Sequence, residues 1–307
     1  MEKLITIVGP TAVGKTDLTL ALAKGYNGEV ISGDAYQVYK HLNIGTAKPT
    51  ADELSIVPHH LIDILDPNDD YSVSIFQQQA RTLIDSLNQN QILPILSGGT
   101  GLYVQSLLEN YNFNDIKPNI ELRAELDELY ANQGIDGLRH RANELAKVGH
   151  INIRFTDKHR LYRAIELMTA GDFDALTSQT KDGLSYEGPV IGLQRERSDL
   201  YDRINRRVEI MFEKGLVDEV KQLLKSGVNP NCQAFKGIGY KEVVQYLEGL
   251  ISYDACVDLI QKNTRHFAKR QITWYKRMPY IEWITIDSQT TEAEIYGMAC
   301  NIIDSSF

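Results

Sequence analysis

Residues 9–16, Gly-Pro-Thr-Ala-Val-Gly-Lys-Thr, match the phosphate-binding pattern G-x-x-x-x-G-K-[S/T]. The preceding residues, 4–8, are apolar and β-branched, which is typical of a buried parallel strand, and residues 15–24 place leucines and alanines at helical spacing. In such a strand–loop–helix unit, backbone N–H groups and the positive helix end face a phosphate. Lys15 adds a charge, and the Thr16 hydroxyl can bind Mg²⁺. The sequence therefore predicts a di- or triphosphate site formed by Gly9, Pro10, Thr11, Ala12, Val13, Gly14, Lys15 and Thr16.

The composition is that of a globular protein, with 43% hydrophobic and 24% charged residues. No apolar run approaches the roughly 20 residues that span a bilayer, so no membrane partner is expected. Cys232, Cys256 and Cys300 lie far apart in the sequence, which predicts neither a paired-cysteine zinc motif nor a disulfide framework. We therefore expect a cytoplasmic protein.

Strand-like and helix-like segments alternate along most of the chain. The expected strands are residues 4–8, 29–32, 61–65, 92–96, 189–193 and 281–286, and helical patterns such as 74–87 and 197–226 separate them. This alternation predicts a parallel sheet covered on both faces. Between 113 and 188 the pattern changes to helices alone, at 120–133, 135–148 and 157–169. We predict an α/β fold of the P-loop NTPase type, a parallel sheet flanked by helices, with its core in residues 1–112 and 189–307 and a helical insertion in 113–188.

Two strand ends carry residues suited to chemistry. The strand at 29–32 is followed by Gly33 and Asp34, and the strand at 92–96 by Ser-Gly-Gly-Thr-Gly, which includes Thr100. Open parallel sheets bind ligands at the carboxyl ends of their strands, so both side chains are expected to face the phosphates. A hydrolase usually ends the second strand with an acid for Mg²⁺ and water. The absence of such an acid, together with Asp34 as a base, favours transfer of a group to an acceptor. Two alternatives remain: Asp34 caps a turn, and residues 97–101 form a turn without a role in binding.

The charged residues are unevenly distributed. The formal net charge is −9, but residues 261–280 contain no acid and six lysines and arginines, Lys269 and Arg270 among them, interleaved with aromatic residues. Basic groups neutralise phosphates and aromatic rings stack on unpaired bases, so this stretch predicts nucleic-acid contact; burial of its aromatic residues in a core is the alternative. The helical pattern from 197 carries four arginines, one or two of which are expected to reach the diphosphate.

The chain also carries a set of motifs beyond the phosphate loop. They are SGDAYQVY (32–39), IGTAKP (44–49), HHLID (59–63), GGTGLY (98–103), RLYRAIE (160–166), GIGYKE (237–242) and AKRQITW (268–274). Only the phosphate loop is common to many enzymes; the set as a whole resembles the bacterial tRNA dimethylallyltransferases over nearly the entire chain.

This resemblance implies transfer of the dimethylallyl group of dimethylallyl diphosphate to N6 of adenosine 37, in the anticodon loop of tRNAs that read codons beginning with U. In matching positions, Asp34 is the general base and Thr100 helps to place the amine. Lys15, Mg²⁺ and Arg197 or Arg203 stabilise the leaving diphosphate, without nucleotide hydrolysis. The implied tRNA contacts are Asp34, Ala35, Tyr36, Gln37, Thr100, Arg123, Arg160 and Arg163, with Lys269 and Arg270 added from the basic stretch. A monomer is expected.

Two departures from the family pattern are visible. Ala35 and Tyr36 replace the usual Ser-Met, which removes a hydroxyl, and Thr156 replaces an Asn in the insertion. Three other readings remain: a small-molecule kinase using ATP, an isopentenyltransferase acting on free adenine nucleotides, and a non-catalytic RNA-binding module. The long insertion and the basic stretch favour tRNA over the first two, and Lys15 and Asp34 would have no role in the third.

Overall fold

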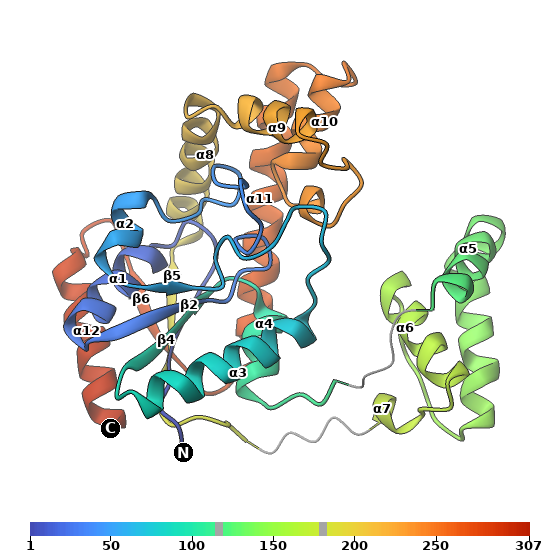
Figure 1. Ribbon diagram of the computed structural model, residues 1–307, viewed down its shortest axis with the longest axis horizontal. Helices are drawn as coiled ribbons and strands as arrows, with labels where there is room; N and C mark the ends of the chain where they lie inside the picture. The colour runs from blue at the N-terminus through green and yellow to red at the C-terminus, as the bar shows by residue number, and fades with distance from the viewer. Residues whose placement is uncertain (114–118, 178–182) are drawn as a thin grey trace. The chain divides into compact units, whose positions relative to one another are not determined.

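The computed structural model describes residues 1–113, 119–177 and 183–307. The chain divides into two compact units, one formed by Met1–Glu109 with Leu184–Phe307 and the other by Asn110–Gly183. Figure 1 shows the sheet with its helices in the first unit and helices alone in the second. The predicted insertion, 113–188, overlaps the second unit.

The first unit is built on a parallel sheet with the strand order β3-β2-β4-β1-β5-β6. The strands are β1 (Ile5–Val8), β2 (Gly28–Ser32), β3 (His59–His60), β4 (Leu93–Gly98), β5 (Val190–Arg195) and β6 (Ile281–Ile286). The prediction of a parallel sheet flanked by helices is thereby confirmed. Three adjacent strands of this sheet, β2, β4 and β1, precede the Asp34 loop, the Thr100 turn and the phosphate loop.

Both faces of the sheet are buried, which explains the continuous apolar runs of the strands. Ile5 and Ile7 of β1 pack in one core cluster, whereas Val8 packs in the other. The first cluster contains side chains of α1 (Lys15–Gly25), α8 (Arg197–Glu213) and α12 (Glu292–Ser306), and the second contains side chains of α3 (Val73–Gln89), α4 (Gly101–Leu108) and α11 (Tyr253–Tyr275).

Two local predictions were wrong. The strand expected at 61–65 is the two-residue β3 instead, because Leu61 and Asp63 have φ angles of 62° and 55°, which an extended strand does not allow. The single helix expected at 197–226 is two helices, α8 and α9 (Leu216–Lys225), separated at Gly215 with φ 94°. Hydropathy alone does not reveal such left-handed residues.

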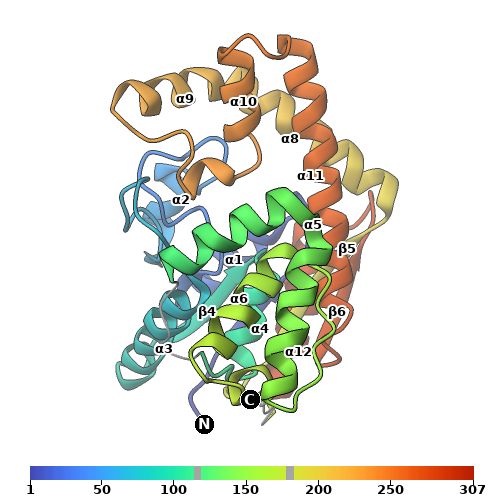
Figure 2. The same ribbon diagram turned by 90° about the vertical axis from the view of Figure 1, so that its right-hand side faces the viewer.

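The helices α8 to α11 gather at one end of the first unit, as the two views show (Figures 1 and 2). Besides α8, α9 and α11, this end contains α10 (Tyr240–Leu247), and the short α2 (Ala51–Ile56) follows the loop after β2. Among the described residues, no helix is long and apolar enough to cross a membrane.

The second unit is helical, with α5 (Ile120–Val148), α6 (Lys158–Thr169) and α7 (Asp174–Thr177). The two helices expected before residue 149 meet at Gly134, whose φ of 63° interrupts α5. Between α5 and α6 lies an apolar core that includes Leu126, Leu138 and Ile165.

A substitution at Phe76, a buried residue of α3, tests the packing of the core beneath this helix. The ring of Phe76 is fully buried and stacks on Tyr103 at 4.6 Å between centroids. We expect Phe76→Ala to lower the free energy of unfolding by about 3–5 kcal/mol, because it removes buried apolar area and leaves a cavity. Its neighbour Ile75 is 41% exposed, so Ile75→Ala should change that free energy by about 0.5 kcal/mol or less. Urea unfolding of the two variants measures the difference, and equal losses would contradict the packing described.

Candidate active site

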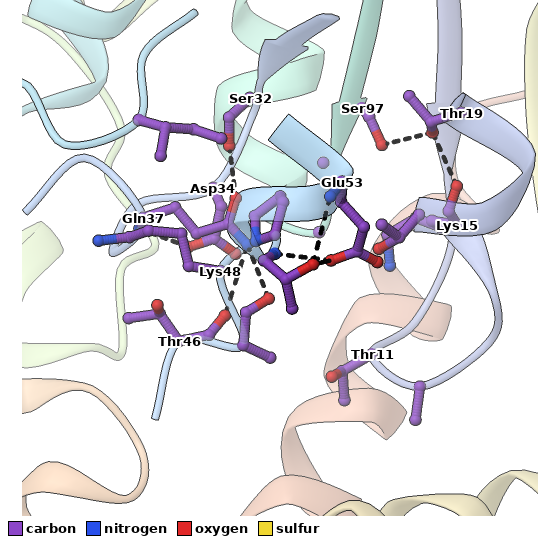
Figure 3. A pocket seen from close by; sticks show the side chains of 18 of the residues that line it. Thr11, Lys15, Thr19, Ser32, Asp34, Gln37, Thr46, Lys48, Glu53 and Ser97 are labelled. Carbon is purple, nitrogen blue, oxygen red and sulfur yellow. Dashed lines mark hydrogen bonds between the residues drawn. The ribbon is translucent and has the colours of Figure 1, made fainter. Parts of the chain in front are cut away.

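A cavity of about 750 Å³ lies where the loops after β1, β2 and β4 meet. Residues 11–14, Asp34 and Gly99 contribute to its lining from these loops, and the start of α1, residues 43–44 and 46–51, and α8 add further walls. Figure 3 shows Asp34 and Gln37 on one side of this cavity and Lys15 on the other. The carboxyl end of a parallel sheet is where such folds bind ligands.

The phosphate loop leads directly into α1. Gly14, with φ 110°, precedes the helix, and no side chain caps the first N–H groups, which leaves them available to an anion. The Lys15 amine donates hydrogen bonds to the carbonyl oxygens of Gly9 (2.9 Å) and Pro10 (2.8 Å). Burial lowers the pKa of Lys15 to about 7; Arg207 also lowers it, and Asp34 opposes the shift.

Three side chains from distant parts of the chain hold the phosphate loop in place. Arg203 donates from Nε to the Ala12 carbonyl (2.9 Å), and Arg195 donates from Nε to the Val13 carbonyl (3.0 Å). The N–H of Thr11 donates to Oε1 of Gln271 (2.9 Å). The Thr11 N–H is therefore already paired within the protein. A bound phosphate would accept hydrogen bonds from the N–H groups that follow it in the loop. The contributions of Arg195 and Gln271 are not predicted from the sequence, because both residues lie far from the loop along the chain.

The arginines of α8 separate into two groups. Arg203 and Arg207 line the cavity, and the Arg207 guanidinium makes no hydrogen bond to any residue that the structure describes. Burial lowers the pKa of Arg207. Arg197 is not among the lining residues, and its guanidinium lies over the ring of Tyr201, 5.1 Å from the centroid. Arg207 is thus better placed for a diphosphate than the predicted Arg197, and its i, i+4 spacing from Arg203 is the signal that would have found it.

Asp34 is held through one carboxylate oxygen. Its Oδ1 accepts hydrogen bonds from the N–H groups of Tyr36 (2.8 Å) and Gln37 (3.3 Å), whereas Oδ2 accepts none from the described part of the chain. Burial raises the pKa of Asp34, and these two N–H groups, Lys15 and Arg207 oppose the rise. Because Thr100 Oγ1 accepts from the Ala35 N–H (3.1 Å), the structure brings the predicted acid and hydroxyl side by side.

The side chain of Gln37 is oriented at both ends. Ser32 Oγ donates to its Oε1 (2.9 Å), and its Nε2 donates to the carbonyls of Thr46 and Ala47 (3.4 Å each). These carbonyls belong to a wall loop, residues 43–48, whose Lys48 amine contacts Asp63 at 2.6 Å. The wall loop lines the cavity, which was not predicted from the sequence.

The remaining predicted tRNA contacts lie in two places. In the second unit, Arg123 pairs with the buried carboxylate of Glu166 (2.6 Å), Arg163 contacts the same carboxylate at 3.5 Å, and Arg160 is exposed. On α11, Lys269 and Arg270 are exposed next to the buried Ala268 and Gln271.

The lowered pKa of Lys15 predicts pH-dependent binding of inorganic diphosphate. In the free protein Lys15 is protonated below about pH 7 and loses its charge as the pH rises through that value. We therefore expect the affinity to fall between pH 6 and pH 9 relative to that of Lys15→Arg, which keeps its charge, since the deprotonation of diphosphate itself affects both proteins alike. Calorimetric titrations at each pH measure both proteins. Parallel profiles would show that Lys15 is not the titrating group.

Comparisons with known proteins place the chain in a family. The family model described as IPP transferase matches residues 37–278, and one described as isopentenyl transferase matches residues 2–64. The tRNA dimethylallyltransferase of Carboxydothermus hydrogenoformans is 44% identical over 95% of this chain and 94% of its own length. That of Alkaliphilus oremlandii is 41% identical, with coverage of 94% and 92%.

Solved structures agree with these relatives. The crystal structure of a tRNA isopentenylpyrophosphate transferase from Bacillus halodurans has a TM-score of 0.75 and 39% identity, and it covers 100% of this chain and 98% of that one. A structure of a eukaryotic dimethylallyltransferase acting on tRNA has a TM-score of 0.82 and 25% identity, covering 99% of this chain and 79% of that one. The phosphate loop, the neighbouring Asp34 and Thr100, and these matches together show that the chain belongs to the IPP transferase family, as a relative of the bacterial tRNA dimethylallyltransferases.

Proposed function

We propose that this protein transfers the dimethylallyl group of dimethylallyl diphosphate to N6 of adenosine 37 in the anticodon stem-loop of tRNAs that read U-starting codons. The observation that carries the proposal is a single cavity with a phosphate loop on one side and Asp34 on the other, whose Oδ2 has no hydrogen-bond partner among the described residues. A leaving diphosphate and an attacking amine need these two features on opposite sides of the reacting carbon.

On the leaving-group side, the protein offers positive charge and N–H donors. Lys15, Arg203 and Arg207 line the cavity with the uncapped start of α1. Charge grows on the diphosphate as its bond to the allylic carbon breaks, so groups fixed in advance stabilise the transition state more than the ground state. Arg203 donates through Nε to the loop and so keeps its terminal nitrogens for the diphosphate.

The residues at the helix start also suit a magnesium ion. Thr16 is exposed, lines the cavity, and forms no side-chain hydrogen bond with a described residue. No three His, Cys, Asp or Glu side chains gather as a metal site in the described ranges. Mg²⁺ is often bound through one or two protein oxygens together with substrate phosphates, which fits Thr16 Oγ1 as its protein ligand. When bound, the ion neutralises diphosphate charge.

On the acceptor side, the exocyclic amine of adenine is a weak nucleophile, because its lone pair is delocalised into the ring. As its nitrogen forms a bond to the allylic carbon, the carbon–oxygen bond to diphosphate breaks and the amine loses a proton to Oδ2 of Asp34. The raised pKa of Asp34 makes its carboxylate a better base than an exposed aspartate. Thr100, next to the Asp34 loop, orients the amine. The adenine must leave its stack to reach this cavity.

The central test is a reaction with unmodified tRNA, dimethylallyl diphosphate and Mg²⁺ but no ATP. We expect nucleoside mass spectrometry to detect N6-dimethylallyladenosine, and Asp34→Asn to lower the rate by about 10²–10⁴-fold. Asn keeps an oxygen for the Tyr36 and Gln37 N–H groups, so tRNA affinity should stay within a few fold. Asp17→Asn, another carboxylate lining the cavity, is the matched control. A near-normal rate for Asp34→Asn would remove Asp34 as the base, and product only with ATP present would favour the kinase reading.

The exposed charges of α11 generate a second test. If Lys269 and Arg270 neutralise tRNA phosphates, Lys269→Glu with Arg270→Glu should weaken tRNA binding and reduce the slope of log affinity against log salt by about 0.7–0.9 per lost contact. Lys221→Glu with Lys225→Glu on α9 makes the same charge change elsewhere and serves as the control. Filter binding across salt concentrations gives the slopes. An unchanged slope in the α11 variant would locate the tRNA surface on other residues.

A further inference from the structure

Gln271 connects two loops that flank the cavity. Its residue is 5% exposed, and both ends of its side-chain amide are paired with backbone atoms. Oε1 accepts from the Thr11 N–H of the phosphate loop (2.9 Å), and Nε2 donates to the Gly99 carbonyl of the turn that carries Thr100 (2.8 Å). Glutamine is mostly found at protein surfaces, so a buried one with both amide groups satisfied indicates a specific role.

Neighbouring residues of α11 contact the same turn. The hydroxyl of Tyr275, one helical turn after Gln271, donates to the Gly98 carbonyl (3.3 Å). The ring of Trp274 packs against Gly101 so closely that a Cβ there would lie 2.5 Å from it. Among the hydrogen bonds made by described residues of α11, those of Gln271 are the ones that reach both the turn and the phosphate loop. The helix therefore braces the turn, and Gln271 extends that brace to the phosphate loop.

We propose that Gln271 is a positioning residue that sets the distance between the diphosphate cradle and the turn that places the acceptor amine. This inference rests on the proposed transfer reaction, in which the two loops hold the leaving group and the nucleophile. Displacement requires reacting atoms about 3–3.5 Å apart, and a misplacement of about 1 Å costs on the order of 10²-fold in rate. A bridge that fixes both loops therefore acts on the rate of the chemical step.

The geometry also links this bridge to the surface of α11. Lys269 and Arg270, directly before Gln271 in the sequence, are exposed, whereas Gln271 is buried against the two loops. The same turn of helix thus carries basic groups on its outer side and the loop bridge on its inner side. Loss of the bridge should therefore change the chemistry and leave the outer basic surface intact, which separates the two effects experimentally.

The test compares Gln271→Met with Gln261→Met. Methionine has nearly the length of glutamine but forms neither hydrogen bond, and Gln261 lies on the same helix with a 3.4 Å contact to the Asn205 carbonyl, outside the cavity lining. We expect Gln271→Met to lower the single-turnover rate at saturating substrates by about 30–100-fold. Its affinity for inorganic diphosphate should fall, and its tRNA affinity should stay within about twofold of the parent protein. Gln261→Met, outside the cavity lining, should change neither the rate nor the affinity for diphosphate.

A second variant keeps the amide. Gln271→Asn is one methylene shorter, so it reaches one loop but not both, and its rate should fall nearly as far as that of Gln271→Met. A rate within twofold of the parent for both variants would overturn the proposal. The proposal would also be overturned if the variants lost affinity for tRNA and for diphosphate to a degree that follows a fall in Tm, because such losses indicate a merely structural role. If the parent protein forms no product, the proposed reaction fails instead, and unchanged diphosphate affinity in Gln271→Met then rejects the bridge separately.

Discussion

The close approach of two backbones, at Gly33 and Gly98, determines the geometry of the site. A Cβ at Gly98 would lie 2.5 Å from the Gly33 carbonyl oxygen, so no residue with a side chain fits there without separating the strands. The contact allows the Gly33 N–H to donate to Ser97 (2.8 Å) and the Thr100 N–H to donate to Gly33 (3.3 Å). Because the loops after β2 and β4 are joined in this way, the Asp34 loop and the Thr100 hydroxyl lie within hydrogen-bond distance of each other.

The cavity holds two buried basic side chains whose positive charges a bound anion would stabilise. Burial opposes the charge on Lys15 and on Arg207, lowering both pKa values, and it raises the pKa of Asp34. A bound diphosphate would reverse the effect on the two cations, because a neighbouring negative charge favours the protonated forms. The same diphosphate would favour protonation of Asp34, which is the direction in which the proposed base would change during the proposed transfer. Substrate binding and proton transfer are thus electrostatically compatible in one small space.

The sequence predicted what depends on local pattern and did not predict what depends on distant contacts. Alternating apolar segments located the strands of the sheet, and the glycine-lysine motif located the phosphate loop. The strand expected at 61–65 failed because the positive φ angles of Leu61 and Asp63 leave no mark on hydropathy. Gln271 accepts a hydrogen bond from Thr11, which lies 260 positions away in the sequence, and the sequence around neither residue predicts this contact. The sequence also does not single out Arg207 among the arginines of α8, because the phase of this helix relative to the sheet is a tertiary property.

A net charge of −9 does not prevent this protein from binding a polyanion. At physiological ionic strength the Debye length is about 8 Å, so acidic residues elsewhere on the surface are largely screened from a phosphate at α11. Lys269 and Arg270 form no ion pair with any residue in the described ranges, and their charges are therefore available to solvent and ligand. In the second unit, by contrast, Glu166 already holds Arg123. A phosphate contacting Arg123 must share its guanidinium with the buried carboxylate of Glu166. The shared contact lowers the affinity for phosphate but fixes the orientation of the guanidinium.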